Sequence, residues 1–415
     1  MKRNPFSLSL RQRGEGRGEG RALTIALLSL LSGCGAQFKP ETLVDALRVL
    51  SITAEPPEVA PGESAQLDIL QLDPSRPGGK TTVVWVGCEP DPIDFNRSAC
   101  NDTSALLQPT AFATFPPGVR ILGFGSRAGY ASARTLFDEL APEDPVRSNG
   151  TSGPVLGVVI GEEVKPTSND AELRELFGKI ERQEIQTVMS LTRVTVTERM
   201  QKNHNPKLAS LELDGVALPK NAKLQLHAGA KVKIVPQATE DSRETYSVIL
   251  PTGPSERSET LVVSWYSTSG RFDQARVDLA KGPDTNFIVP GSKEIPDDPV
   301  PEKRTGTIWL VMRDGRGGQH AETLPFYICD DSPTPTLTRL QAPTNAGDPL
   351  VATGDNIAGT LDLVIGGVAL TRASYSPGSN AFLGDVPVLP SGTYAVELRA
   401  KNCSVIDTGL TWTVP

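Results

Sequence analysis

The sequence predicts an all-β chain of three tandem β-sandwich domains, the first of which carries an α/β insertion. Short runs that alternate apolar and polar residues, as half-buried strands do, follow one another from residue 47 onward. Turn-forming Gly and Pro, 38 and 35 of the 415 residues, separate these runs. One order of strands and turns also occurs more than once, and a recurring unit is stronger evidence for a domain than any single strand.

The first 33 residues are predicted to be a signal peptide. Residues 1–21 carry six Lys and Arg against two Glu, and an uncharged, largely apolar run occupies residues 22–31. A run this short cannot span a bilayer about 30 Å thick as a helix, but it fits the core of a signal peptide. We therefore expect the chain to be exported.

The end of this run indicates how the chain is processed. Leu31, the small residues Ser32 and Gly33, and then Cys34 resemble the lipobox of bacterial lipoproteins. The resemblance implies cleavage between Gly33 and Cys34, lipidation of the Cys34 thiol and acylation of its new amine, which together anchor a chain stably to a membrane. Gly35, where many inner-membrane lipoproteins have Asp, favours the outer membrane and leaves the periplasmic or surface orientation open. An ordinary secretory signal is the alternative.

After a tether at residues 34–46, residues 47–200 are predicted to form the first domain. A strand at 48–53, a Pro-rich turn, an alternating strand at 65–69 and a strand containing Trp85 follow one another. This order resembles the opening of an immunoglobulin-like sandwich.

The first domain is longer than the roughly 100 residues of a simple sandwich, and its surplus, about residues 100–180, is predicted to be an insertion. Apolar residues there recur at helical spacing, and Asn169 precedes them as an N-cap. These apolar residues are Leu173, Leu176, Phe177 and Ile180. Strands at 155–160 and 187–197 are expected to complete the sandwich.

Residues 204–331 are predicted to form the second domain. Strands at 208–213 and 232–235, and a strand containing Trp265, repeat the order of the first domain. Residues 306–328 then contain an alternating strand, an Asp-Gly-x-Gly-Gly turn and a final strand, and they resemble the last hairpin of a PKD-like domain. The glycines suit this turn because a tight hairpin demands positive φ.

Residues 332–415 are predicted to form the third domain. Gly354 before a short strand, and the Pro-Ser-Gly stretch at 388–392, resemble an IPT/TIG domain. Other strands are expected at residues 337–340, 360–365 and 393–398. The PKD-like and IPT/TIG resemblances rest on structural motifs, so they imply a fold and no activity.

The five cysteines are expected to provide one lipid-attachment site and two disulfide bonds. With Cys34 lipidated, four cysteines remain, and an exported chain permits disulfides. Of the three pairings that four cysteines allow, we expect Cys88 with Cys100 and Cys329 with Cys403. Because the chain has no CxxC or HExxH spacing, we expect no metal site and no cofactor.

One charged turn is a candidate ligand-binding site. Trp309 lies in the strand before the turn, and Arg313, Asp314 and Arg316 lie in or beside it, so that they offer an aromatic ring and charges to an anionic sugar. The sequence favours the alternative of a solvated turn, because charged residues in connecting segments usually face water. The tryptophans of the earlier strands are expected to be core residues.

The net charge argues against a nucleic-acid partner. Lys and Arg number 41 against 49 Asp and Glu, a formal charge of −8, whereas phosphate binding needs a basic face. Residues 1–33 hold six of the basic and two of the acidic residues. The processed chain would therefore carry 35 against 47, a charge of −12.

Together these features predict a lipid-anchored cell-envelope protein that acts as a non-catalytic binding or structural module. Its expected partner, besides the membrane, is a polysaccharide or another envelope protein. One alternative is an enzyme with its site in the insertion at 100–180, the part that exceeds the needs of the fold. Another is an accessory lipoprotein of an envelope assembly or secretion machine.

Overall fold

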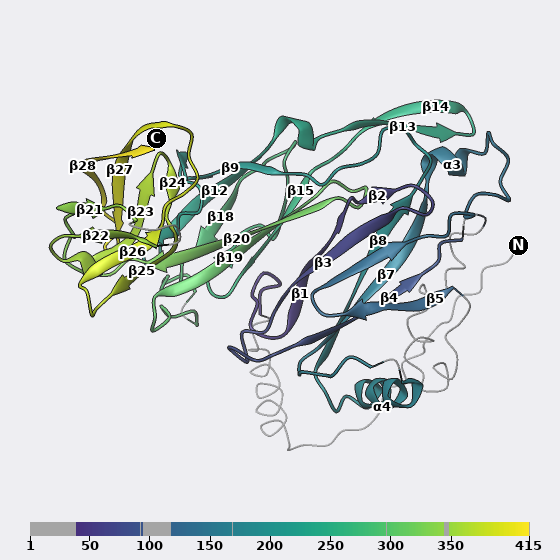
Figure 1. Ribbon diagram of the computed structural model, residues 1–415, viewed down its shortest axis with the longest axis horizontal. Helices are drawn as coiled ribbons and strands as arrows, with labels where there is room; N and C mark the ends of the chain where they lie inside the picture. The colour runs from purple at the N-terminus through teal and green to yellow at the C-terminus, as the bar shows by residue number, and fades with distance from the viewer. Residues whose placement is uncertain are drawn as a thin grey trace, which may run out of the picture. The chain divides into compact units, whose positions relative to one another are not determined.

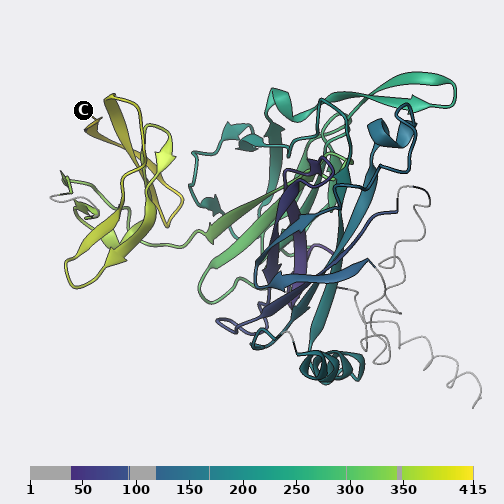
Figure 2. The same cartoon turned by 45° about the vertical axis from the view of Figure 1, so that its right-hand side comes forward.

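The computed structural model describes residues 39–91, 93, 118–167, 169–295, 297–343 and 348–414. Its strands form three pairs of sheets that follow one another along the chain, coloured purple to blue, teal to green, and yellow in Figures 1 and 2. The predicted class, all-β with three tandem sandwiches, is confirmed. No helix within these described ranges is long and apolar enough to cross a membrane.

The first sandwich divides its strands in the immunoglobulin-like manner. One sheet has the order β1 (Arg48–Glu55), β3 (Ser64–Leu72), β6 (Arg127–Ala131). The other has the order β2 (Glu58–Val59), β8 (Thr187–Val196), β7 (Thr151–Ile160), β4 (Thr82–Cys88), β5 (Val119–Phe124). Strand β2 runs parallel to β8. As expected, Trp85 is a core residue with no exposed surface, and its indole N–H donates to the carbonyl oxygen of Gly125 at 2.8 Å.

The part of this domain outside its sheets is smaller than residues 100–180. Strands β5, β6 and β7 belong to the sandwich itself. What remains among the described residues is the segment that leads into the short helix α3 (Pro145–Asn149), together with the helix α4 (Asp170–Glu181). Helix α4 begins where the sequence predicts, since the side chain of Asn169 accepts a hydrogen bond from the backbone N–H of Ala171 at 2.9 Å.

Helix α4 explains why β4 is buried along its whole length. Alternate residues of a strand face opposite sides of the sheet. Val83 and Trp85 face the sandwich core, whereas Val84 and Val86 pack in one cluster with the apolar face of α4. That face is formed by Leu173, Leu176, Phe177 and Ile180. The sheet is therefore buried on both sides at β4.

The second sandwich has two five-stranded sheets and an additional hairpin. One sheet has the order β10 (Val216–Ala217), β9 (Leu208–Leu213), β12 (Lys231–Ala238), β18 (Thr285–Ile288), β16 (Arg271–Phe272). The other has the order β11 (Leu224–Leu226), β20 (Gln319–Ile328), β19 (Thr305–Arg313), β15 (Val262–Ser267), β17 (Arg276–Asp278). The hairpin consists of β13 (Thr245–Leu250) and β14 (Gly253–Ser258), which follow the 3₁₀ turn η3 (Glu240–Ser242).

The core and the last hairpin of this domain agree with the sequence. Trp265 is fully buried and stacks on Phe272, with 5.3 Å between the ring centroids. Strands β19 and β20 pair from Thr305 opposite Tyr327 to Arg313 opposite Gln319, on either side of the predicted glycine-rich turn. Gly315 in that turn has a φ of 82°, which a residue with a side chain rarely adopts.

The third sandwich has two four-stranded sheets. One has the order β21 (Arg339–Gln341), β22 (Leu350–Thr353), β26 (Ala381–Asp385), β25 (Thr371–Ser376). The other has the order β24 (Val368–Ala369), β23 (Thr360–Ile365), β27 (Gly392–Ala400), β28 (Val405–Val414). Gly354 follows β22, and the 3₁₀ turn η4 (Ile357–Gly359) separates it from β23, the strand expected at residues 360–365. Glycine suits position 354 because a Cβ there would collide with the carbonyl oxygen of Thr336.

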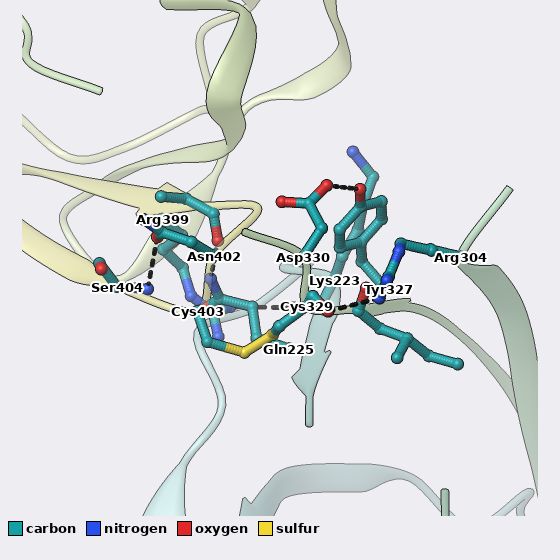
Figure 3. Close-up of a disulfide and its surroundings, with 12 residues drawn as sticks. Lys223, Gln225, Arg304, Tyr327, Cys329, Asp330, Arg399, Asn402, Cys403 and Ser404 are labelled. Atoms are coloured by element: carbon teal, nitrogen blue, oxygen red, sulfur yellow. Dashed lines mark hydrogen bonds between the residues drawn. A yellow bond between two sulfur atoms is a disulfide. The ribbon is translucent and has the colours of Figure 1, made fainter. Parts of the chain in front are cut away.

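A disulfide joins the end of the second sandwich to the third. Cys329 follows β20, Cys403 lies in the turn between β27 and β28, and their Cα atoms are 5.5 Å apart (Figure 3). This pairing was predicted and is confirmed. Cys88 is also disulfide-bonded. Cys100, its predicted partner, lies outside the described residues, as does Cys34.

The Cys329–Cys403 bond is expected to stabilise the third sandwich. It closes a loop across a sequence separation of 74 residues, and a disulfide typically stabilises a domain by about 2–4 kcal/mol. In the double variant Cys329→Ser/Cys403→Ser, hydrogen exchange measured by mass spectrometry should accelerate in β27 and β28, with exchange in β4 and β7 as the internal control. Unchanged exchange in β27 and β28 would contradict this expectation.

Candidate functional site at the junction of the first two sandwiches

The turn between β19 and β20 lies in the junction between the first and second sandwiches, and it is not solvated. Asp314 is only 2% exposed, and the side chain of Arg316 is 10% exposed. The expectation of a solvated turn is therefore wrong. The physical reason is that residues distant in sequence cover the turn and neutralise its charges.

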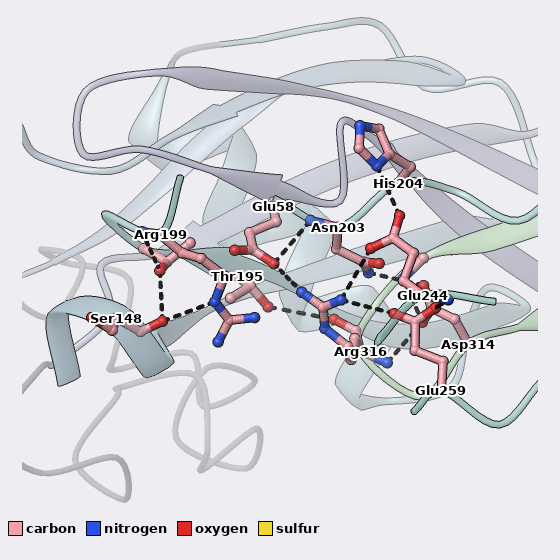
Figure 4. Close-up of polar contacts among 12 residues, drawn as sticks. Glu58, Ser148, Thr195, Arg199, Asn203, His204, Glu244, Glu259, Asp314 and Arg316 are labelled. Atoms are coloured by element: carbon pink, nitrogen blue, oxygen red, sulfur yellow. Dashed lines mark hydrogen bonds and ion pairs between the residues drawn. The ribbon is translucent and has the colours of Figure 1, made fainter. Parts of the chain in front are cut away.

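Arg316 is the centre of an ion cluster that involves both sandwiches (Figure 4). Its guanidinium contacts Glu58 on β2 of the first sandwich at 2.8 Å. It also contacts Glu259 at 2.9 Å and Glu244 at 3.2 Å, both from the second sandwich. The guanidinium carbon lies 4.2 Å from the centroid of the Tyr246 ring. The planar fork of arginine suits this role because it can bond several carboxylates at once.

Asp314 holds the turn in shape from inside. Its Oδ1 accepts the backbone N–H groups of Arg316 at 2.7 Å and Gly318 at 3.0 Å. Its Oδ2 accepts the side-chain amide of Asn203 at 2.8 Å. Burial raises the pKa of Asp314, and burial also raises the pKa of Glu259, although their hydrogen bonds act in the opposite direction.

The other two candidate ligand-binding residues are also engaged within the chain. Trp309 is 4% exposed and packs in one cluster with Val44 and Leu50, which precede and begin the first sandwich. The guanidinium of Arg313 donates to the carbonyl oxygen of Leu50 at 3.0 Å and to the hydroxyl of Ser264 at 3.1 Å. This burial argues against the predicted anionic-sugar site at Trp309, Arg313, Asp314 and Arg316, because a stacking ring and the binding charges must face the ligand.

A side-chain clasp joins the two sandwiches at a second place. The side-chain amide of Asn149, at the end of α3, donates to the carbonyl oxygen of Ile249 on β13 at 2.8 Å. The amide oxygen of Asn149 accepts the backbone N–H of Ile249, also at 2.8 Å. The hairpin β13–β14 is thereby held against the first sandwich.

Sequence reasoning missed the partners of Arg316. Glu58 lies on β2, directly after Pro56 and Pro57 and 258 residues earlier, and Glu259 lies 57 residues earlier in a connection between strands. Neither stands in a local pattern that marks it as buried. The one available signal was the density of charge in the turn itself, at Arg313, Asp314 and Arg316.

The second and third sandwiches also share a buried ion pair. Asp362 on β23, whose side chain is 4% exposed, lies 3.3 Å from the ammonium of Lys223. Arg399 on β27 donates to the carbonyl oxygen of Lys223 at 3.1 Å, and Gln225 donates to that of Ala400 at 2.6 Å. Burial raises the pKa of Asp362 and lowers the pKa of Arg399. Both junctions therefore use buried charge.

A cavity of about 460 Å³ lies beside the Arg316 turn, and one of about 750 Å³ lies between the second and third sandwiches. The smaller one takes its walls from β8, β13, α3 and the β19–β20 turn. Among the described residues, one group of three has the spacing of metal ligands, namely His227, Cys329 and Cys403. Its two sulfur atoms form the disulfide, so they offer no thiolate to a metal.

Comparisons with known proteins show no family for this chain. No family model matches it, and no curated protein matches it. Among solved structures, a protein crystallised with a xylogluco-oligosaccharide is similar to this chain, with 10% sequence identity and a TM-score of 0.18. The match covers 89% of this chain and 60% of that one, so this chain spans less than two thirds of that protein's length. Extracellular domains 3–5 of Drosophila OTK are similar at 10% identity and a TM-score of 0.18, with 89% of this chain and 95% of that one covered. Tandem Ig repeats of Dlar are similar at 11% identity and a TM-score of 0.19, with 69% of this chain and 98% of that one covered. Scores this low carry no argument about function.

Removal of the Arg316 guanidinium is expected to destabilise the first junction. In Arg316→Ala, Glu58 and Glu259 lose their cation while they remain buried, and an uncompensated buried charge costs about 3–5 kcal/mol. Hydrogen exchange should accelerate in β2 and in the β19–β20 turn. The matched control is Arg257→Ala, an exposed arginine on β14. Equal exchange in the two variants would refute the role assigned to Arg316.

Acidification is expected to stabilise the folded chain through one buried carboxylate at each junction. Glu259 and Asp362 have pKa values raised above 4.5 and 3.8, so the folded chain binds their protons more tightly than the unfolded chain. Their contribution to stability is full below the unfolded pKa, near about 4, and is lost as the pH rises through the raised folded pKa. In Glu259→Gln and Asp362→Asn, urea unfolding between about pH 8 and pH 5 should show a smaller gain on acidification than in the parent chain.

Comparison with the parent chain is needed because other carboxylates act with the opposite sign. Hydrogen bonds keep the pKa of Asp273 and of Asp330 below the usual value, and that part of the stability is lost on acidification. These groups are common to parent and variant, so they cancel in the difference. An identical pH dependence in the parent and both variants would contradict the expectation.

Proposed function

We propose that the chain is a lipid-anchored protein of the cell envelope that acts as a non-catalytic binding or structural module. The observation that carries the proposal is that the buried charges of the first junction bond to one another. Glu58, Glu259 and Asp314 are committed to Arg316 and to the backbone of its turn. Such groups fix two sandwiches together and are not directed at a reacting substrate.

The proposed anchor rests on the sequence pattern. A short apolar run ends in Leu31-Ser-Gly-Cys34, and a small pair before the cysteine gives a peptidase access to the bond. In this proposal residues 1–33 are removed, residues 34–46 are a tether, and Cys34 carries the lipid in the outer membrane. The sandwiches, proposed at residues 47–200, 204–331 and 332–415, then face the periplasm or the exterior. We propose a PKD-like identity for the second and an IPT/TIG-like identity for the third, on the motifs at 314–318 and 388–392.

The packing of α4 supports the non-catalytic proposal over an enzyme with its site at residues 100–180. Of the described residues of that segment, β5, β6 and β7 are strands of the sandwich, and α4 presents four apolar side chains to the sheet. This helix shields the outer face of β4 from water, so its apolar residues are explained by packing. The proposed partner, besides the membrane, is a polysaccharide or another envelope protein.

Metabolic labelling with a radioactive or clickable palmitate is expected to mark the chain at Cys34. The parent should incorporate the label and Cys34→Ala should not, because the thiol is the lipid acceptor. The matched control is Cys329→Ser/Cys403→Ser, which removes two other cysteines and should label like the parent. Labelling of Cys34→Ala would refute the anchor.

Co-purification after extraction in mild detergent tests the second part of the proposal. A binding module should bring a polysaccharide or one envelope protein with it, in amounts that Cys34→Ala reduces by releasing the chain from the membrane. A stoichiometric set of several envelope proteins would favour the accessory lipoprotein of an assembly or secretion machine. Recovery of the chain with no component in either case would argue against a binding role.

A further inference from the structure

The cavity beside the Arg316 turn contains two arginines, Arg193 and Arg199, that have no acidic partner among the described residues. Leu191, Arg193 and Thr195 alternate along β8 and therefore share the face that lines the cavity. The exposed side chain of Arg193 has no hydrogen-bond or ion-pair partner among the residues that the structure describes. The guanidinium of Arg199 lies 5.7 Å from the Tyr246 ring, and its Nε donates to the carbonyl oxygen of Ser148 at 3.1 Å. No described carboxylate lies within ion-pair distance of it.

The nearby acidic residues are already committed elsewhere. Glu198, the neighbour of Arg199 in sequence, pairs with Arg147 at 2.9 Å. Glu58, the one acidic residue of the lining, pairs with Arg316. The mouth of the cavity thus holds unneutralised positive charge in a chain whose formal charge is −8. Guanidinium groups of this kind recognise carboxylate, sulfate and phosphate groups.

The same lining holds buried acceptors without donors. One carboxylate oxygen of Glu58, Oε1, and the amide oxygen of Gln319 are buried and have no hydrogen-bond partner among the described residues. In Figure 4 the free oxygen of Glu58 points away from Arg316, on the side of Arg199 and Thr195. An unsatisfied buried acceptor is costly, and an O–H or N–H donor relieves that cost. A ligand that fits must therefore combine an anionic group with donors.

The size and polarity of the cavity restrict the ligand further. A volume of about 460 Å³ is that of a small-molecule site. Leu191 and Val248 are the aliphatic residues of the lining, and most of the remainder is polar or charged. Peptides bind chiefly through apolar anchor side chains in matching pockets, and this lining provides little for them. A sugar ring offers several hydroxyl donors in a small volume.

We propose that this cavity binds a carboxylate-bearing sugar residue of an acidic polysaccharide. Arg193 and Arg199 bind the carboxylate, and Glu58 and Gln319 accept hydrogen bonds from ring hydroxyls. The inference rests on the proposed function as a binding module and assigns to it a site and a ligand class. It differs from the site predicted at Trp309, Arg313, Asp314 and Arg316, since only Arg316 of that set lines this cavity, and its guanidinium is paired with glutamates.

The test is calorimetric titration of the full chain in detergent with tetragalacturonate, its fully methyl-esterified form and a tetraglutamate peptide. Tetragalacturonate should bind, and the ester, which keeps the ring hydroxyls but has no charge, should bind at least about tenfold more weakly. Arg193→Gln and Arg199→Gln should each weaken binding about five- to tenfold. Arg193 is exposed, so its variant should unfold at the same temperature as the parent. Arg339→Gln, an exposed arginine of the third sandwich, is the matched control and should bind like the parent.

Three outcomes would overturn the proposal. They are no binding of tetragalacturonate at millimolar concentration, unchanged binding in both arginine variants, and binding of tetraglutamate as tight as that of the saccharide, which would indicate an acidic peptide. Failure here is separable from failure of the proposed function. If the double variant Arg193→Gln/Arg199→Gln still co-purifies with an envelope component as the parent does, the cavity is wrong and the binding function stands.

Discussion

The contact of one guanidinium with three glutamates is the interaction on which the first junction depends. Arg316 supplies the cation that faces Glu58 and Glu259, whose side chains are only 2% and 1% exposed. Without a cation, two such carboxylates would have to bind protons or return to water, since the transfer of an isolated charge into a protein interior is very costly. Because Glu58 belongs to the first sandwich and Arg316 to the second, neutralisation requires that the sandwiches stay docked.

Charge at a junction serves a different purpose from apolar contact. Apolar surfaces tolerate sliding, whereas an ion cluster is satisfied only in one arrangement, and a buried ion pair is a better source of specificity than of net stability. Both junctions follow this rule. The first combines the Arg316 cluster with the apolar contact of Trp309, and the second combines the pair of Asp362 and Lys223 with a small apolar cluster around Ala222. The disulfide adds a covalent limit at the second.

Local patterns allowed most of the fold to be predicted, and long-range contacts explain what was missed. The spacing of Leu173, Leu176, Phe177 and Ile180 and the cap at Asn169 predicted α4, because both signals lie within one segment. The tryptophan strands and the hairpin around Gly315 were predicted for the same reason. The environment of Arg316 was not, because Glu58 decides it from 258 residues away. A glycine-rich turn with three charges has the same local pattern whether water or another domain covers it.

The proposed saccharide site and the first junction are thermodynamically linked. The cavity takes Arg193 and Arg199 from the first sandwich, and Tyr246 and Gln319 from the second. A ligand that touches both sides binds the docked arrangement and not the separated one. Ligand binding therefore stabilises the junction. The stabilisation grows with the logarithm of the ratio of the ligand concentration to the dissociation constant once that ratio exceeds one. Conversely, the Arg316 cluster prepares the cavity, because the glutamates that it engages would otherwise compete for Arg193 and Arg199. The charge that holds the sandwiches together thus also leaves Arg193 and Arg199 available to an anionic ligand.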